Sequence, residues 1–160
     1  MEARPAIEGG CACGAVRYRA LDAGFLPYAC HCQGCQRRQG SAFALNQQVL
    51  AADFSCTGAT TQGRVTSVSG AQVTHTACAA CLTRVYTAND RRPDLVTIRT
   101  GTRDDSPQMS PAFHIWTSSM QPWIDLPGHV PAFTGQPDEA EWLHLVRPAG
   151  EVEGLAAEPR

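Results

Sequence analysis

The sequence predicts a mainly β fold, and three observations lead to this prediction. Short runs of alternating polar and apolar residues, or of β-branched residues, recur along the 160 residues and outnumber segments with helical periodicity. Glycine, proline, asparagine and aspartate separate these runs. Hydrophobic residues make up 43% of the chain, which is enough for one core of ordinary size. We therefore expect a single small β domain.

Six segments carry the strand pattern. In chain order they are Ala15–Ala20, Phe43–Leu50, Arg64–Ser69, Ala71–Thr76, Arg84–Ala88 and Leu95–Thr100. Helical signals are brief: one stretch follows Cys32 through Arg38, and a second covers Glu139–Leu145. From Pro148 onward the chain is rich in Ala, Glu, Gly and Pro, so we expect a mobile tail with too little apolar content to pack.

Charge and hydropathy argue against two classes of partner. The formal net charge is −2, and no stripe of Lys and Arg with interleaved aromatic residues appears, so we expect no nucleic acid partner. No apolar run approaches the roughly 20 residues that a membrane span needs. The first ten residues lack the apolar core of a signal peptide. The sequence therefore predicts a cytoplasmic protein without a membrane partner.

Eight cysteines in a chain of this size need a joint explanation. A secreted disulfide scaffold is one, but Cys11 and Cys13, like Cys30 and Cys32, are too close for easy bridges within each pair. Metal ligation is the other. Short spacings let a single turn aim several thiolates at one ion. We therefore expect zinc rather than disulfides.

Four of the cysteines form two pairs separated by more than sixty residues, Cys11 with Cys13 and Cys78 with Cys81. A closed tetrahedral site of four thiolates requires two loops to meet. Such a site would tie the amino-terminal strand to a loop late in the sheet and stabilise a small β domain. The sequence predicts a structural zinc here.

Three more cysteines, Cys30, Cys32 and Cys35, lie within six residues. Three ligands leave one coordination position of zinc open for water or substrate, which is typical of catalytic sites. Two residues offer ways to close it. His31 lies between two ligands, where strand alternation would point its side chain away. Cys56 has no partner motif beside it and is otherwise a small packed residue. The fourth ligand stays open at this point.

These segments resemble a known family, the glutathione-dependent formaldehyde-activating enzyme and centromere protein V family. The matching motifs run in family order: Gly9–Tyr18, Cys30–Arg37, Ser41–Phe43, Cys78–Cys81, Gly101–Asp105, Pro111–Trp116 and Pro122–Trp123. The resemblance implies a zinc-binding domain over residues 7–135, with residues 136–160 as a partly disordered extension. It also implies an Mss4-like fold of stacked antiparallel sheets and the same division of cysteines between a structural and a catalytic zinc.

Three positions depart from the family pattern. Leu82 stands where glycine usually follows the second cysteine pair, and leucine tolerates a left-handed backbone poorly. Arg103 replaces an apolar residue before the Asp-Asp pair, and Met120 replaces a basic residue. None of the three removes a predicted zinc ligand, but together they indicate that the substrate need not be glutathione.

By resemblance, the reaction is the addition of a small thiol such as glutathione to formaldehyde or a similar small electrophile, catalysed by a carbon–sulfur lyase or synthase. Cys30, Cys32 and Cys35 would hold the catalytic zinc. Arg37 and Arg38, just past this cluster, are candidate donors to a substrate carboxylate, with a solvated helix face as the alternative. His114 and Trp116 are further candidates, although Phe113–Trp116 fits first a core-packing strand with one hydrogen-bonded histidine.

Two rival functions remain open at this stage. One is a non-catalytic, zinc-stabilised binding module, and the other is a lyase acting on a different small sulfur compound. A homo-oligomer is also left open. The remaining histidines, His75, His129 and His144, have no ligand-like neighbours and are expected to be exposed or hydrogen-bonded.

Overall fold

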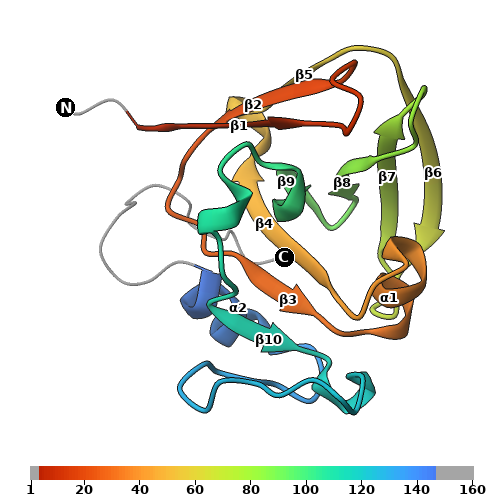
Figure 1. The fold of residues 1–160 in the computed structure, drawn as a ribbon. Helices are drawn as coiled ribbons and strands as arrows, with labels where there is room; N and C mark the ends of the chain where they lie inside the picture. Colours follow the sequence, from red (N-terminus) through yellow and green to blue (C-terminus); the bar gives the residue numbers. More distant parts are fainter. Residues whose placement is uncertain (1–3, 147–160) are drawn as a thin grey trace.

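The computed structural model describes residues 4–146, which form two sheets and two α-helices (Figure 1). The small sheet has the order β1-β2-β5 and the large sheet the order β10-β3-β4-β9-β8-β7-β6. All neighbours pair antiparallel except β10 and β3, which are parallel. The strands are β1 (Ala6–Gly10), β2 (Arg17–Leu21), β3 (Tyr28–Cys30), β4 (Ala44–Leu50), β5 (Ser55–Thr57), β6 (Thr60–Thr66), β7 (Gln72–Cys78), β8 (Arg84–Asn89), β9 (Arg92–Arg99) and β10 (Phe113–Ile115).

The predicted mainly β fold is confirmed, and each of the six predicted strands has a counterpart. Most boundaries shift by one to four residues, and Ser67–Ser69, which was expected to be strand, forms the turn between β6 and β7. The Ser67 amide donates to the Ala71 carbonyl at 2.8 Å and closes this turn. The prediction also missed β1, β3 and β5. These strands have three to five residues, too few for alternation to be read with certainty from sequence.

The large sheet has an apolar face and a polar face. The apolar face packs against the small sheet, and together they bury Ile7, Val16, Tyr18, Val49, Val96 and Ile98. On the polar face, the cross-strand partners Gln48, Thr97, Thr87 and His75 form one row across β4, β9, β8 and β7, with Asn46 opposite Arg99 beside it. Strand alternation places these polar residues together, and they line the cavity described below.

A second core lies around the parallel pair β3 and β10. Helix α2 (Glu139–Val146) buries Trp142 there, with its ring edge-on to Tyr28 at 4.9 Å and to Phe113 at 5.6 Å. The prediction of a helix at Glu139–Leu145 is therefore confirmed. The tail predicted from Pro148 onward lies outside the described residues.

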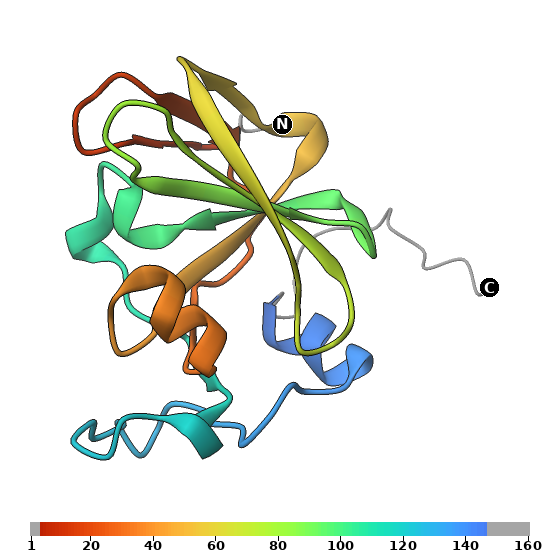
Figure 2. The ribbon, with the colours of Figure 1, turned by 90° about the vertical axis from the view of Figure 1, so that its right-hand side faces the viewer.

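Helix α1 (Gln33–Gln39) confirms the short helical stretch predicted after Cys32. In two views, α1 and α2 lie at the end of the molecule opposite the β1–β2 hairpin (Figures 1 and 2). Neither helix in residues 4–146 is long and apolar enough to cross a membrane.

Replacing Trp142 tests whether α2 is an integral part of the fold. Trp142→Ala removes the ring from the second core and should lower the free energy of unfolding by about 3–5 kcal/mol. Its neighbour Leu143 is 41% exposed, so Leu143→Ala should cost less than about 1 kcal/mol. Urea unfolding followed by circular dichroism measures both. Equal small losses would mean that α2 does not support the core.

Candidate active site

The four cysteines predicted to form a structural site come together at the junction of the two sheets. Cys11 and Cys13 lie in the loop between β1 and β2, while Cys78 ends β7 and Cys81 lies in the turn before β8. Their sulfur atoms are all within 4.8 Å of one another. The Val16 amide donates to the Cys11 sulfur at 3.2 Å, and amide donors stabilise a thiolate. This donor set fits a closed, tetrahedral zinc site.

The turn that carries Cys81 needs a left-handed residue. Leu82 has a φ of +60°, and its amide donates to the Cys78 carbonyl at 3.0 Å. The next residue, Thr83, donates its hydroxyl to the Cys81 sulfur at 3.2 Å and lowers the pKa of that thiol to about 5. The turn is therefore kept with leucine in the position that glycine favours, at a cost in backbone strain.

The three remaining predicted ligands, Cys30, Cys32 and Cys35, also converge, with all sulfur atoms within 4.8 Å. Cys30 ends β3, Cys32 is the residue before helix α1, and Cys35 lies in its first turn. The Cys35 amide donates to the Cys32 sulfur at 3.3 Å. Hydrogen bonds from the Cys30 and Cys35 thiols lower the pKa of Cys32, so the group favours one thiolate at this position.

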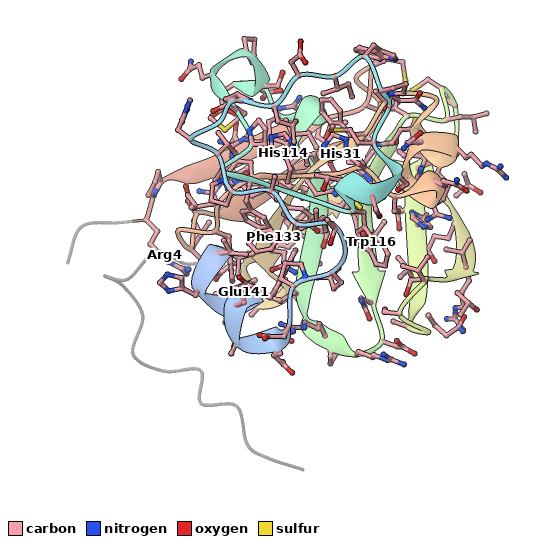
Figure 3. All side chains as sticks on the ribbon, turned by 90° about the horizontal axis from the view of Figure 1, so that it is seen from below. Arg4, His31, His114, Trp116, Phe133 and Glu141 are labelled. Atoms are coloured by element: carbon pink, nitrogen blue, oxygen red, sulfur yellow. The ribbon has the colours of Figure 1, made fainter. Side chains whose placement is uncertain are left out.

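Neither residue considered as a closing ligand joins this cluster. His31 is fully buried, and its Nε2 lies 2.9 Å from Nδ1 of His114 (Figure 3). Cys56 lies on β5 in the small sheet, opposite Tyr18. Within residues 4–146, no other His, Cys, Asp or Glu belongs to the group of three sulfur atoms. The site is thus a three-thiol set, the type that leaves a coordination position of zinc open.

A cavity of about 520 Å³ opens beside the three cysteines. Cys30, Cys32 and Cys35 line one part of it, and the polar face of the large sheet lines another. Of the predicted substrate residues, Arg38 and Trp116 also line this cavity. A small molecule in the cavity can therefore reach the cysteine cluster.

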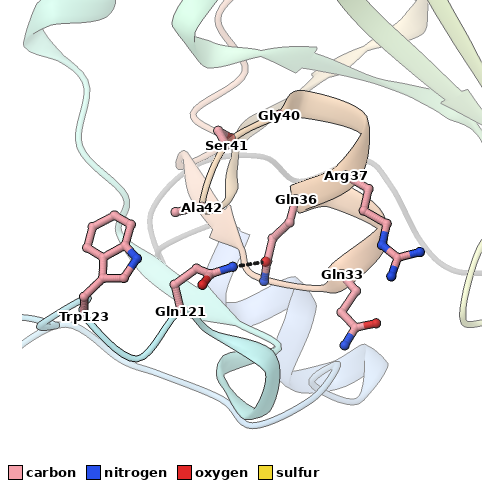
Figure 4. A pocket seen from close by; sticks show the side chains of 8 residues that line it. All are labelled: Gln33, Gln36, Arg37, Gly40, Ser41, Ala42, Gln121 and Trp123. Atoms are coloured by element: carbon pink, nitrogen blue, oxygen red, sulfur yellow. Dashed lines mark hydrogen bonds between the residues drawn. The ribbon is translucent and has the colours of Figure 1, made fainter.

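The other two predicted substrate residues lie elsewhere. Arg37 borders a shallow surface hollow with Gln33, Gln36 and Trp123 (Figure 4). His114 is 5% exposed, bonds to His31, and does not line the cavity. His114 instead supports the expectation of a core strand with one hydrogen-bonded histidine. The hydrogen bond between His114 and His31 joins β10 to the residue that lies between Cys30 and Cys32.

Three residues at the cavity were missed by sequence reasoning: His75 and Arg99 line its wall, and Arg84 lies behind them, bonded to His75. His75 was expected to be exposed or hydrogen-bonded, and it is the latter, because its Nδ1 accepts from the guanidinium groups of Arg84 and Arg99. His129 and His144 are exposed, as expected. The available signal was alternation: Thr97 and Arg99, like Asn46 and Gln48, are polar residues two positions apart, so each pair shares one face of its strand.

The departure at Arg103 has a structural explanation. Arg103 is 8% exposed, and its guanidinium donates two hydrogen bonds to the Asp105 carboxylate, at 2.7 and 2.6 Å, and one to Gln47. Asp104 pairs with Arg17. Asp104 and Asp105 thus form ion pairs with Arg17 and Arg103, and neither aspartate lines the cavity.

Comparison with known proteins identifies the family of this chain. A family model described as glutathione-dependent formaldehyde-activating enzyme matches residues 6–119. The chain belongs to this family. A protein of Halomonas elongata, which carries the provisional name glutathione-dependent formaldehyde-activating enzyme, is 26% identical over 147 residues, or 85% of this chain and 93% of its own. A crystal structure of a Rhodobacter sphaeroides protein is 18% identical with a TM-score of 0.48, covering 61% of this chain and 88% of that one.

The family match confirms the resemblance stated above and places both cysteine groups inside the matched residues. The match ends at residue 119, so the expected domain boundary at residue 135 stays a prediction.

Leu82 offers a test of the strained cysteine turn. Leu82→Gly removes the Cβ that opposes the left-handed backbone and should raise the free energy of unfolding by about 0.5–1 kcal/mol. Leu82→Ala keeps a Cβ at the same φ, and because the native side chain is 67% exposed it should bring no such gain. Urea unfolding in a fixed excess of zinc measures both. A loss of stability in the glycine variant would contradict this account.

Proposed function

We propose that the chain is a zinc-dependent carbon–sulfur lyase or synthase that joins formaldehyde to a small thiol such as glutathione, giving an S-hydroxymethyl adduct. One observation carries the proposal: three cysteine sulfurs converge within 4.8 Å and line a cavity large enough for a thiol of that size. The family and the name of the Halomonas elongata relative support the same substrates. We further propose that the protein acts in the cytoplasm, where free cysteines stay reduced.

Two zinc ions per chain would serve different purposes. Cys11, Cys13, Cys78 and Cys81 form a complete set of four ligands, so we assign them a structural ion. We assign Cys30, Cys32 and Cys35 to a catalytic ion. Zinc held by three thiolates supplies an exchangeable position that favours a soft sulfur ligand and lowers the pKa of a thiol.

The protein's own contribution is position and surroundings. The sulfur of the thiol forms a bond to the carbonyl carbon of formaldehyde, the carbonyl π bond breaks, and the thiol proton ends on the new hydroxyl group. Arg38 and Trp116 line the cavity beside the cysteines and would orient the thiol. Bringing the two reactants together removes much of the entropic barrier of a bimolecular step.

The zinc content of cysteine variants tests the assignment of two ions. The native chain should hold two zinc ions when purified with zinc, measured by atomic emission. Cys32→Ser should reduce this to one and leave the folded state intact, whereas Cys78→Ser should destabilise the fold as well, because metal-binding free energy is folding free energy at a structural site. Cys56→Ser is the control and should keep both ions. A single ion in the native protein would contradict the assignment.

The rate of adduct formation tests the proposed activity. Formaldehyde and thiols combine spontaneously, so the measurement is the rate above that background, followed by NMR line-shape or exchange analysis. The native protein should accelerate adduct formation, Cys32→Ser should bring the rate back to the spontaneous value, and Cys56→Ser should match the native rate. Saturable thiol binding without acceleration would favour the non-catalytic binding module, and acceleration with another sulfur compound alone would favour a different lyase.

A further inference from the structure

The cavity contains a buried arginine that has no carboxylate partner in the described part of the chain. Arg99, at the end of β9, is 6% exposed. Its guanidinium donates to the Asn46 side-chain oxygen and, at 3.5 Å, to Nδ1 of His75, while its Nε is buried without a partner. Within residues 4–146, no carboxylate pairs with it. Burying an unpaired charge is costly, so such a residue needs a compensating partner.

Two more arginines concentrate positive charge at the same place. Arg84 also donates to His75 Nδ1, and Arg38 from helix α1 lines the same cavity. Burial, with repulsion from Arg99 and Arg38, lowers the pKa of Arg84 to about 10, and burial lowers the pKa of Arg99. Arginine side chains nevertheless keep their charge near neutral pH, because the guanidinium group is not deprotonated in proteins. Within residues 4–146, neither Arg38 nor Arg84 has a carboxylate partner.

His75 adds a neutral donor. Burial, followed by repulsion from Arg84 and Arg99, lowers the pKa of His75 to about 3, so the ring is neutral near pH 7. Because Nδ1 accepts hydrogen bonds, the hydrogen of the neutral ring is on Nε2, which is buried and has no partner in the described part of the chain. We call Arg38, His75, Arg84 and Arg99 the arginine cluster.

The cysteines balance only part of this charge. The thiolates of Cys35 and Cys30 attract Arg99 and raise its pKa against the effect of burial. Three thiolates on Zn²⁺ leave a net charge of about −1, which is less than the charge of three guanidinium groups. Among the described residues that line the cavity, Glu139 carries the one carboxylate, and it pairs with Arg92 at 3.0 Å. The cavity beside the cysteines is therefore electropositive.

We propose that the arginine cluster binds a carboxylate of the substrate thiol while the thiol sulfur reaches Cys30, Cys32 and Cys35. This inference rests on the proposed function and adds a selection rule to it: the substrate is an acidic thiol, and a neutral thiol of the same shape is a poor ligand. A planar carboxylate suits guanidinium donors in both geometry and charge. Arg99 is the central contact because it is the buried member of the cluster.

Calorimetric titration of the full-length, zinc-loaded protein with two matched thiols tests this inference. Mercaptopropionate carries a carboxylate, and mercaptopropionamide replaces it with an uncharged group of similar shape. A charge-assisted hydrogen bond contributes about 1.5–3 kcal/mol, so the acid should bind about 10- to 100-fold more tightly than the amide. Arg99→Gln should abolish most of this preference and leave binding of the amide nearly unchanged.

Two further variants complete the design. Arg64→Gln, at an exposed position of β6 outside the cavity wall, should keep the native preference. Arg84→Gln should reduce the preference and replaces Arg99→Gln if the latter fails to fold or loses zinc, as judged by circular dichroism and metal content.

The outcomes separate the two proposals. If Arg99→Gln weakens the acid and the amide equally, or if the native protein binds both thiols equally, the arginine cluster only offsets the thiolates and the inference is overturned. If the native zinc-loaded protein binds neither thiol, the proposed function fails and the inference fails with it.

Discussion

Sulfur atoms gathered within 4.8 Å of one another impose the constraint on which this structure depends. Several thiols this close cannot all ionise without a cation, because adjacent thiolates repel. A zinc ion at each of the two clusters would turn that repulsion into attraction. At Cys11, Cys13, Cys78 and Cys81 such an ion would join the β1–β2 loop to the turn after β7 and would hold the small sheet against one end of the large one.

The second cluster depends on a different set of supports. Cys30 and Cys32 flank a fully buried residue, His31, whose carbonyl accepts from Gln36 at 2.6 Å and from Ser119 at 3.0 Å. Its ring bonds to His114 on β10, which pairs parallel to β3. The segment that carries the cysteines is thus fixed by its backbone and by a histidine pair, and the three sulfurs are left to face the cavity.

The large sheet has two unlike faces: one packs on the small sheet, and the other lines the cavity beside the second cysteine cluster. Its apolar face packs on the small sheet, where Val49, Val96 and Ile98 lie. Its polar face would be solvated in most antiparallel sheets, yet here part of it lies inside a cavity beside the three cysteines. Arg99 and Asn46, cross-strand partners on β9 and β4, therefore meet in a buried place where charge and hydrogen bonds act strongly.

The sequence by itself determined the two cysteine groups, the mainly β fold and the family. The ligand pattern is local, because each pair or triplet lies within one turn. The longer strands show their alternation over six to eight residues. Only the tertiary structure decided the rest. His75, Arg84 and Arg99 come from three different strands, and the sequence does not state which strands are neighbours or which face is covered. The short strands β1, β3 and β5 and the left-handed Leu82 likewise depend on pairing and on the cysteine turn, since their own residues carry little preference for these conformations.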